Sequence, residues 1–255
     1  MSLLVLSPDR PHAPQRQPIL NVPAVVTALA GVMLLVHAVR ALLDIDSDIE
    51  VLALFAFIPA RYDSGLLIDG GWPGGAGADA WSFITYAFLH GSLTHIGLNL
   101  LWLLAFGSPV ARRFGTVRFL LFFAATAAAG AALHLATHAG EMAPVVGASA
   151  AISGCMAAAI RFVFAARGLD GLRPGSFEAS VRAPAPPLGV VLRERRVFVF
   201  VAVWFALNIA IGLGAPLAGE AGTVAWEAHI GGFIAGLLLF PLFDPVGRGP
   251  AIRRA

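Results

Sequence analysis

Charged side chains are scarce in this sequence of 255 residues. Asp, Glu, Lys and Arg together make up 13% of it, whereas hydrophobic residues make up 58% and the mean hydropathy is +0.81. An ordinary soluble domain carries about 25% charged residues. The scarcity argues against a soluble globular protein and favours a chain that crosses a membrane several times.

Two residue types are almost or entirely missing. The sequence has no lysine, so its 17 basic residues are all arginine, and with 15 acidic residues the formal charge is only +2. A charge this small does not indicate a nucleic-acid binder. The single Cys155 cannot form a disulfide within the chain and has no CxxC partner, which indicates a small packing residue rather than redox chemistry.

Long apolar runs predict an all-α membrane protein with six transmembrane helices, because each span needs roughly 20 apolar residues. The predicted helices cover residues 20–43, 82–106, 117–137, 149–166, 197–213 and 223–243, between tails at 1–19 and 244–255. The long connection 44–80 contains an apolar stretch, 51–59, that is too short to span. We expect an interfacial or re-entrant element there.

The distribution of charge predicts the orientation. The two tails and the loops after the second and fourth helices, with their flanking ends, hold 15 of the 17 arginines. The three other loops, with their flanks, hold ten of the 15 acidic residues. The positive-inside rule then places both termini in the cytoplasm, so that the fourth and sixth helices begin on the outer side.

A serine and a histidine in two apolar helices are the strongest candidates for chemistry. Ser149 lies in a run of small residues that opens at Gly147, and His229 lies in the sixth helix. Serine is a weak nucleophile unless a base takes its proton, and His229 is the best-placed base. His229, Gly232 and Gly236 fall on one helical stripe, where two glycines let a neighbouring backbone approach closely.

The second helix supplies candidates for an oxyanion hole. His95 and Asn99 are spaced i, i+4, so they project together from that helix. Both can donate hydrogen bonds to a developing negative charge, together with the backbone N–H of Ser149 at a helix N-terminus. Nucleophile, base and oxyanion hole are the groups that acyl transfer needs.

Other interpretations of the same residues remain open. A lone GxxxG or GxS pattern in an apolar helix usually reflects packing, and a buried serine often bonds a carbonyl of the preceding turn. The histidines near the outer helix ends could instead hold haem or a metal. They are His90, His95, His134, His138 and His229. The sequence contains no HExxH, which argues against a zinc metalloprotease.

Three motifs in this order and spacing resemble the rhomboid family of intramembrane serine proteases. They are His90-Gly91-Ser92-Leu93-Thr94-His95 continuing to Asn99, Gly147-Ala148-Ser149, and Ala228-His229-Ile230-Gly231-Gly232. Two upstream segments, Ile58-Pro59-Ala60-Arg61-Tyr62 and Trp81 with Thr85-Tyr86-Ala87-Phe88, are also similar to family sequence. The resemblance extends from the first predicted helix to the sixth.

The resemblance implies a rhomboid-like six-helix bundle whose water-accessible cavity opens to the outside. It also implies a catalytic dyad without a third, acidic member. Ser149 would be the nucleophile and His229 the general base, while His95, Asn99 and the Ser149 amide would stabilise the oxyanion. His90 and Ser153 are candidates for supporting roles.

Four positions depart from the commoner family pattern. Ala150 follows the serine where many members have glycine, and Ser153 replaces an aromatic residue that often packs against the histidine. Ser82 stands where arginine usually follows the loop tryptophan, and Ala111 where glutamate usually precedes the basic turn. None of these changes removes a reacting group.

The sequence therefore predicts a multi-pass serine endopeptidase of a bacterial cytoplasmic membrane. Its expected partners are the lipid bilayer and transmembrane protein substrates, with no nucleic acid, no cofactor and no metal. Helix 197–213 and loop 214–222 are candidate gates for substrate, by analogy with the family alone. The alternatives are a catalytically inactive rhomboid-like membrane binding protein and a haem- or metal-binding membrane protein.

Overall fold

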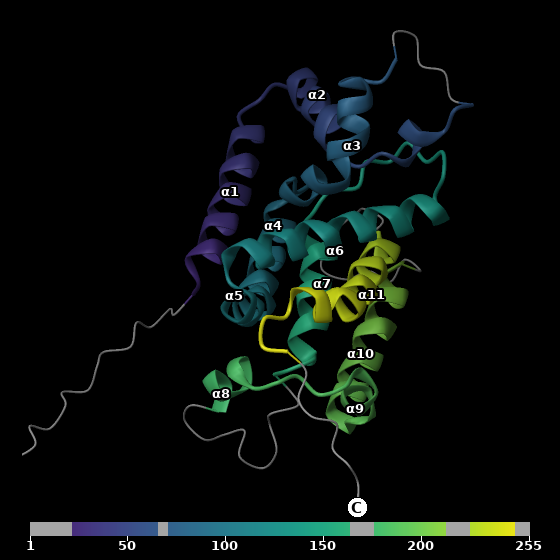
Figure 1. Ribbon diagram of the computed structural model, residues 1–255. Helices are drawn as coiled ribbons and strands as arrows, with labels where there is room; N and C mark the ends of the chain where they lie inside the picture. The colour runs from purple at the N-terminus through teal and green to yellow at the C-terminus, as the bar shows by residue number, and fades with distance from the viewer. Residues whose placement is uncertain (1–21, 66–70, 164–175, 213–224, 248–255) are drawn as a thin grey trace, which may run out of the picture.

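The computed structural model describes residues 22–65, 71–163, 176–212 and 225–247. Within these ranges the chain is helical apart from turns and one isolated antiparallel bridge between Phe57 and Val145 (Figure 1). In chain order the elements are α1 (Ala24–Arg40), α2 (Ile45–Phe55), η1 (Pro59–Tyr62), α3 (Gly75–Thr85), η2 (Tyr86–Phe88), α4 (Leu93–Trp102), η3 (Leu103–Gly107), α5 (Ser108–Phe114), α6 (Thr116–Thr137), α7 (Ser149–Ile160), α8 (Ser176–Arg182), α9 (Leu188–Arg193), α10 (Arg195–Gly212) and α11 (Trp226–Phe243).

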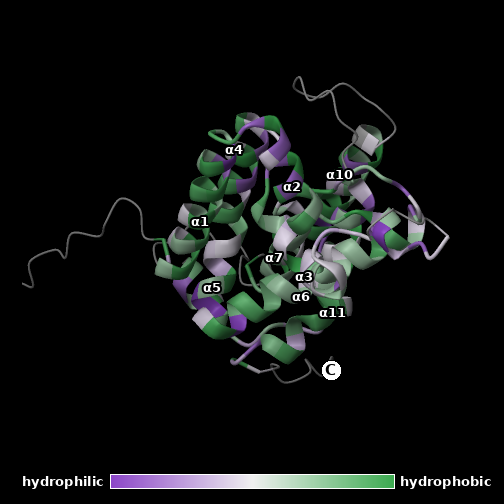
Figure 2. Cartoon of the chain, turned by 90° about the horizontal axis from the view of Figure 1, so that it is seen from above, coloured by the Kyte–Doolittle hydropathy of each residue, from purple (hydrophilic) through white to green (hydrophobic). Residues whose placement is uncertain are grey.

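Three helical stretches in the described ranges are long and apolar enough to cross a membrane. They are the continuous run Leu93–Phe114, then α6, then α11, and α1 and α7 are shorter apolar helices. Large hydrophobic side chains such as Leu35, Leu121 and Leu238 are exposed on the outward faces of α1, α6 and α11. Figure 2 shows how widely hydrophobic residues cover these helices. Such surfaces suit lipid as the surrounding medium.

Helix α7 lies at the centre of the bundle. Every residue from Ala150 to Ile160 is buried, and α6, α11 and η3 pack around the helix (Figure 1). A helix of 12 residues is about 18 Å long, whereas the hydrocarbon core of a bilayer is about 30 Å thick. It cannot reach both surfaces, and its first residue, Ser149, lines an internal cavity instead.

Glycines allow α11 to contact α7 through its backbone. A Cβ atom added at Gly232 would collide with the carbonyl oxygen of Ala150, and one added at Gly236 would lie 2.7 Å from the Cα of Gly154. No side chain larger than hydrogen fits at either position without moving the helices apart. The predicted GxxxG stripe of the sixth helix therefore faces α7.

The structure corrects the predicted second helix, 82–106. The chain leaves helical geometry after η2, and a new helix begins at Leu93, where the Ser92 hydroxyl accepts a hydrogen bond of 3.0 Å from the His95 backbone N–H. The helix then continues through Pro109 to Phe114. Proline lacks an N–H, and the π-helical turn η3 just before it loosens the backbone pairing so that the helix can continue.

Other predicted boundaries differ by less. The predicted helix 149–166 ends at Ile160, and the predicted helix 223–243 is described from Trp226 onward. The connection 44–80 contains the helices α2, η1 and the start of α3. The tail 1–19, most of the tail 244–255 and the candidate gate at 214–222 lie outside the described residues.

A buried ion pair between Arg113 and Asp244 joins α5 to the end of α11. The Arg113 guanidinium donates to both carboxylate oxygens of Asp244 at 2.8 and 2.9 Å, and to the carbonyl oxygens of Val181 and Ala183 at 2.9 Å each. A buried pair is tolerated only when its remaining donors are satisfied, as they are here. Asp244 thus supplies a carboxylate to the basic turn, although position 111 is alanine.

We expect the Gly232→Ala variant to be destabilised by about 1–3 kcal/mol, because the added methyl group forces α11 away from α7. The matched control is Gly31→Ala in α1, where a Cβ meets no atom within 4 Å. Thermal unfolding in detergent measures both variants. An equal midpoint for the two variants would show that the packing at Gly232 is not tight.

Candidate active site

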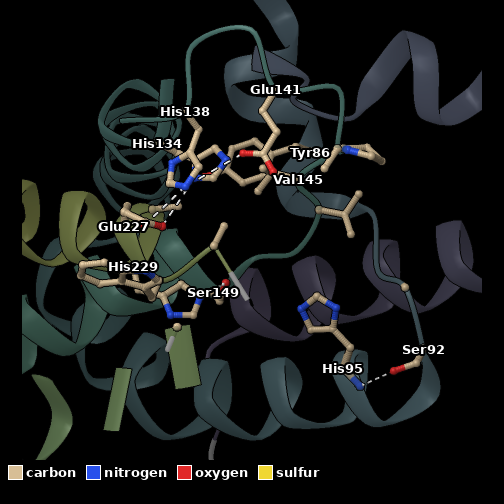
Figure 3. Close-up of a pocket in the computed structure, with 18 of the residues that line it drawn as sticks. Tyr86, Ser92, His95, His134, His138, Glu141, Val145, Ser149, Glu227 and His229 are labelled. Atoms are coloured by element: carbon tan, nitrogen blue, oxygen red, sulfur yellow. Dashed lines mark hydrogen bonds and ion pairs between the residues drawn. The ribbon is translucent and has the colours of Figure 1, made fainter. Parts of the chain in front are cut away.

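A cavity of about 540 Å³ lies where three helices begin and one ends. Helices α4, α7 and α11 contribute their N-terminal turns, and α6 contributes its C-terminal turn (Figure 3). Its lining includes Tyr86, Ser92, His95, His134, His138, Glu141, Val145, Ser149, Glu227 and His229. The helix N-termini carry partial positive charge, so the cavity favours negative charge near Ser149.

The loop before α7 is held by backbone hydrogen bonds. Phe57 and Val145 exchange two bonds of 3.1 and 2.8 Å, and the Gly147 N–H donates to the Tyr86 carbonyl at 2.9 Å. Gly147 has a φ of +117°, and a Cβ there would lie 2.6 Å from His95 Nε2. Glycine at this position therefore allows the turn into α7 and leaves room for the His95 ring beside Ser149.

Ser149 and His229 form a direct hydrogen bond. The distance between Ser149 Oγ and His229 Nε2 is 2.7 Å, although the two residues are 80 positions apart in sequence. His229 lies in the first turn of α11, which begins at Trp226. The contact depends on the close packing of α11 against α7 at Gly232.

Asn208 on α10 is a third member of this hydrogen-bonded chain, and sequence reasoning missed it. Its Oδ1 lies 2.6 Å from His229 Nδ1, while its Nδ2 donates to the Trp204 carbonyl at 2.8 Å. The second bond fixes the amide orientation, so the oxygen faces the histidine and can only accept. His229 Nδ1 must therefore carry the proton, which leaves Nε2 free to accept from the Ser149 hydroxyl.

The predicted oxyanion donors have different positions. The Ser149 N–H belongs to the first turn of α7, where backbone donors have no intrahelical partner. His95 lines the cavity, with its ring pointing into it from α4 (Figure 3). The Asn99 side chain is buried and donates to the His95 carbonyl at 2.9 Å, so it must rotate to reach an oxyanion.

The two candidate supporting residues stabilise their neighbours. The His90 ring packs edge-on against the His95 ring, with centroids 5.2 Å apart. Burial, reinforced by the nearby His95, lowers the pKa of His90 to about 3, so its ring is neutral at physiological pH. Ser153 donates a hydrogen bond of 2.7 Å to the Ser149 carbonyl inside α7.

Two of the departures from the family pattern acquire a structural account. The Ala150 methyl group faces α6, because an added Cβ at Gly130 would lie 2.6 Å from it. α11 meets the carbonyl oxygen of Ala150 rather than its methyl group. The Ser82 hydroxyl is hydrogen-bonded to the Tyr62 hydroxyl at 2.8 Å.

Fold and site together define a helical membrane protein with a serine–histidine pair in an internal cavity. A sequence model described as "Rhomboid domain" matches residues 77–244, more than half of the chain, and the chain therefore belongs to the rhomboid family. It is similar to human Rhomboid-related protein 3, with 37% identity over 76 residues. That match covers 29% of this chain and 18% of the relative, so the chain covers less than two thirds of that protein.

We expect Asn208→Leu to slow modification of Ser149 by a serine-directed reagent by roughly tenfold. The variant loses one hydrogen bond, worth about 1 kcal/mol, and the proton of the His229 ring is then no longer held on Nδ1. Asn208→Asp keeps an acceptor oxygen and should retain most of the rate. The labelling rate is measured on variants with matched unfolding temperatures. An unchanged rate in the leucine variant would exclude a positioning role for Asn208.

Proposed function

We propose that this protein is an intramembrane serine endopeptidase that hydrolyses peptide bonds in or near transmembrane segments of other membrane proteins. The observation that carries the proposal is the hydrogen bond of 2.7 Å between Ser149 Oγ and His229 Nε2. It is supported by the bond from His229 to Asn208 and by the cavity among apolar helices. Membership of the rhomboid family is consistent with this activity.

In the first step Ser149 Oγ attacks the scissile carbonyl carbon while its proton passes to His229 Nε2. The Asn208 amide oxygen accepts a hydrogen bond from His229 Nδ1–H, which stays protonated, and keeps the ring aligned as a neutral counterpart of an acidic third residue. The tetrahedral intermediate then collapses. The C–N bond breaks, the leaving amine takes the proton from His229 Nε2, and an acyl-enzyme ester remains on Ser149.

In the second step water hydrolyses the ester. His229 takes a proton from the water molecule, the hydroxide adds to the acyl carbon, and Ser149 leaves as an alcohol after its oxygen regains the proton. The products are a free carboxyl end and a free amine end of the substrate. The polar lining of the cavity provides a place for this water within an otherwise apolar bundle.

Negative charge on the intermediate would be stabilised by the Ser149 N–H and by His95, whose ring lies beside Ser149, with Asn99 joining after side-chain rotation. The convergence of three helix N-termini adds to the same field. A substrate helix must unwind locally before its carbonyl can enter this hole, because a helical carbonyl is already hydrogen-bonded. We therefore expect helix-destabilising and small residues at the cleaved bond.

The orientation that we propose places the cavity on the outer side of a cytoplasmic membrane, with both termini inside. Its support is the arrangement of charge along the helices that begin at the cavity. The run Leu93–Phe114 ends with Arg112 and Arg113, and α7 is followed by Arg161. These arginines lie at the ends opposite the cavity, as the positive-inside rule requires.

Labelling with a fluorophosphonate tests the proposal directly. We expect the detergent-purified parent to be labelled, Ser149→Ala to be unlabelled, and His229→Ala to react at least about 100-fold more slowly, because general-base assistance is lost. Ser47→Ala in α2, whose side chain does not line the cavity, is the matched serine control. Labelling that survives Ser149→Ala would identify a different nucleophile, and an unlabelled folded parent would favour a non-catalytic binding protein.

His95→Ala provides a separate test of the oxyanion hole. Loss of one donor to the oxyanion is expected to reduce cleavage of a transmembrane substrate in proteoliposomes by roughly 100- to 1,000-fold in kcat, with a smaller change in KM. Peptide cleavage is followed by mass spectrometry, which also locates the cleaved bond. A variant that changes only KM would assign His95 to substrate binding instead.

A further inference from the structure

A cluster of histidines and glutamates on the cavity wall takes no part in the chemistry of Ser149. His134 and His138 lie one turn apart at the end of α6, with stacked rings whose centroids are 4.4 Å apart. Glu227 in the first turn of α11 and Glu141 in the loop after α6 face them across the upper part of the cavity (Figure 3). The four side chains come from three segments that enclose the same space.

Their donor atoms converge. Glu227 lies 3.7 Å from His134 Nδ1 through one oxygen and 3.7 Å from His138 Nε2 through the other. His138 Nε2 also lies 4.0 Å from Glu141, and His134, His138 and Glu141 offer donor atoms that all lie within 4.8 Å of one another. These separations are too long for hydrogen bonds but close to those around a shared ion.

His134 gives a second, independent reason to expect a ligand. The residue is only 5% exposed, and its Nδ1 has no hydrogen-bond partner among the described residues although it faces Glu227. A buried polar atom left unsatisfied costs about 1–3 kcal/mol, so such atoms are rare unless a ligand or water completes them. Other polar groups in the same helices, such as Thr126, bond a carbonyl of the preceding turn.

His138 is already arranged as a ligand. Its Nδ1 lies 2.8 Å from the Thr137 hydroxyl, which can donate its own proton to the carbonyl oxygens of Leu133 or His134, both at 3.1 Å. The hydroxyl therefore accepts from Nδ1–H, and the lone pair falls on Nε2, the atom that faces both glutamates. Such an outer partner typically orients a metal-binding histidine.

We propose that His134, His138, Glu141 and Glu227 form a binding site for a divalent transition-metal ion of the zinc class at the rim of the cavity. Two imidazoles and two carboxylates match zinc better than Ca²⁺ or Mg²⁺, which prefer oxygen ligands alone. Around tetrahedral zinc, ligand atoms about 2.0–2.2 Å from the metal are separated by roughly 3.4 Å. The two separations between Glu227 and the histidines, 3.7 Å each, need only a small contraction to reach that value.

No sequence motif predicts this site, and the sequence itself led us to expect no metal. His134 and His138 form an HxxxH pair without an intervening Glu, and the third and fourth ligands lie elsewhere in the chain. Only the packing of α11 against α6 brings Glu227 to the two histidines.

A bound ion would join the end of α6, the loop after it and the start of α11. Glu227 lies two residues before His229, so the ion would hold the segment that carries the proposed base and narrow the entrance to Ser149. This consequence rests on the proposed peptidase function: we expect zinc to inhibit it reversibly. The binding site itself does not depend on that function.

Equilibrium dialysis and calorimetry with Zn²⁺ alone test the binding. We expect one tightly bound ion per chain in Ser149→Ala protein in detergent, and a loss of affinity of more than about tenfold in His138→Ala and Glu227→Gln. Co²⁺ in place of zinc should give the visible absorption of a tetrahedral site. Glu50→Gln, an exposed acid of α2, and His37→Ala are matched controls that should bind as the Ser149→Ala protein does.

Absence of stoichiometric binding to the folded protein would overturn the proposal. It would also be overturned if the His138→Ala and Glu227→Gln variants bound zinc as tightly as the Ser149→Ala protein. Preference for Ca²⁺ over Zn²⁺ would also overturn it. His138 and Glu227 are partly exposed to the cavity, and unfolding temperatures verify that their variants remain folded.

Inhibition is tested on protein with Ser149 intact. Zinc should slow fluorophosphonate labelling of the parent, chelator should restore it, and His138→Ala should be insensitive. Inhibition that persists in His138→Ala would reject the regulatory consequence and indicate binding to the dyad itself. A parent that binds zinc but is never labelled would refute the peptidase function and leave the metal site standing.

Discussion

The backbone contact between α11 and α7 is the constraint on which the site depends. In lipid there is no hydrophobic force to press two apolar helices together, so small residues and close van der Waals packing must hold them. At Gly232 and Gly236 the missing side chains bring α11 against the backbone of α7. A shift of about 1 Å there would break the hydrogen bond between Ser149 and His229, whose atoms are 2.7 Å apart. The hydrogen bond between the serine and the histidine therefore depends on how closely these two helices pack.

The same arrangement determines the electrostatics of the cavity. Ser149, His95 and His229 all lie in first helical turns, so the positive ends of α4, α7 and α11 meet around one space. This field suits an oxyanion, but it also gathers three positive helix ends in a medium of low polarity. Glu141 and Glu227 line the same cavity and supply compensating negative charge. An ion bound between them and the histidines would reduce that compensation, which connects the metal site to the field at Ser149.

Much of this organisation follows from sequence because the signals are local. The apolar runs predicted helices that the structure contains, and the small residues around Gly147 and Gly232 predicted where two of them come close. The break at 86–92 and the passage through Pro109 were missed, because hydropathy does not distinguish a bent or π-helical segment from a straight one. Asn208 was missed since one asparagine in an apolar helix matches no motif. A polar side chain in an apolar membrane helix is energetically unfavourable, and this was the one signal that could have indicated a role for Asn208.

A polar side chain inside an apolar bundle needs a hydrogen-bond or charged partner. The polar side chains of this bundle differ in the kind of partner that each one has. Thr126 and Ser153 bond carbonyls in their own helices, and Arg113 is neutralised by Asp244. Asn208 and His229 are hydrogen-bonded to each other, and His229 is also hydrogen-bonded to Ser149. His134, by contrast, has a buried nitrogen that faces Glu227 and has no hydrogen-bond partner in the part of the chain that the structure describes. The need of buried polar groups for partners, which the Ser149–His229 pair meets within the protein, therefore points to a ligand between His134 and Glu227.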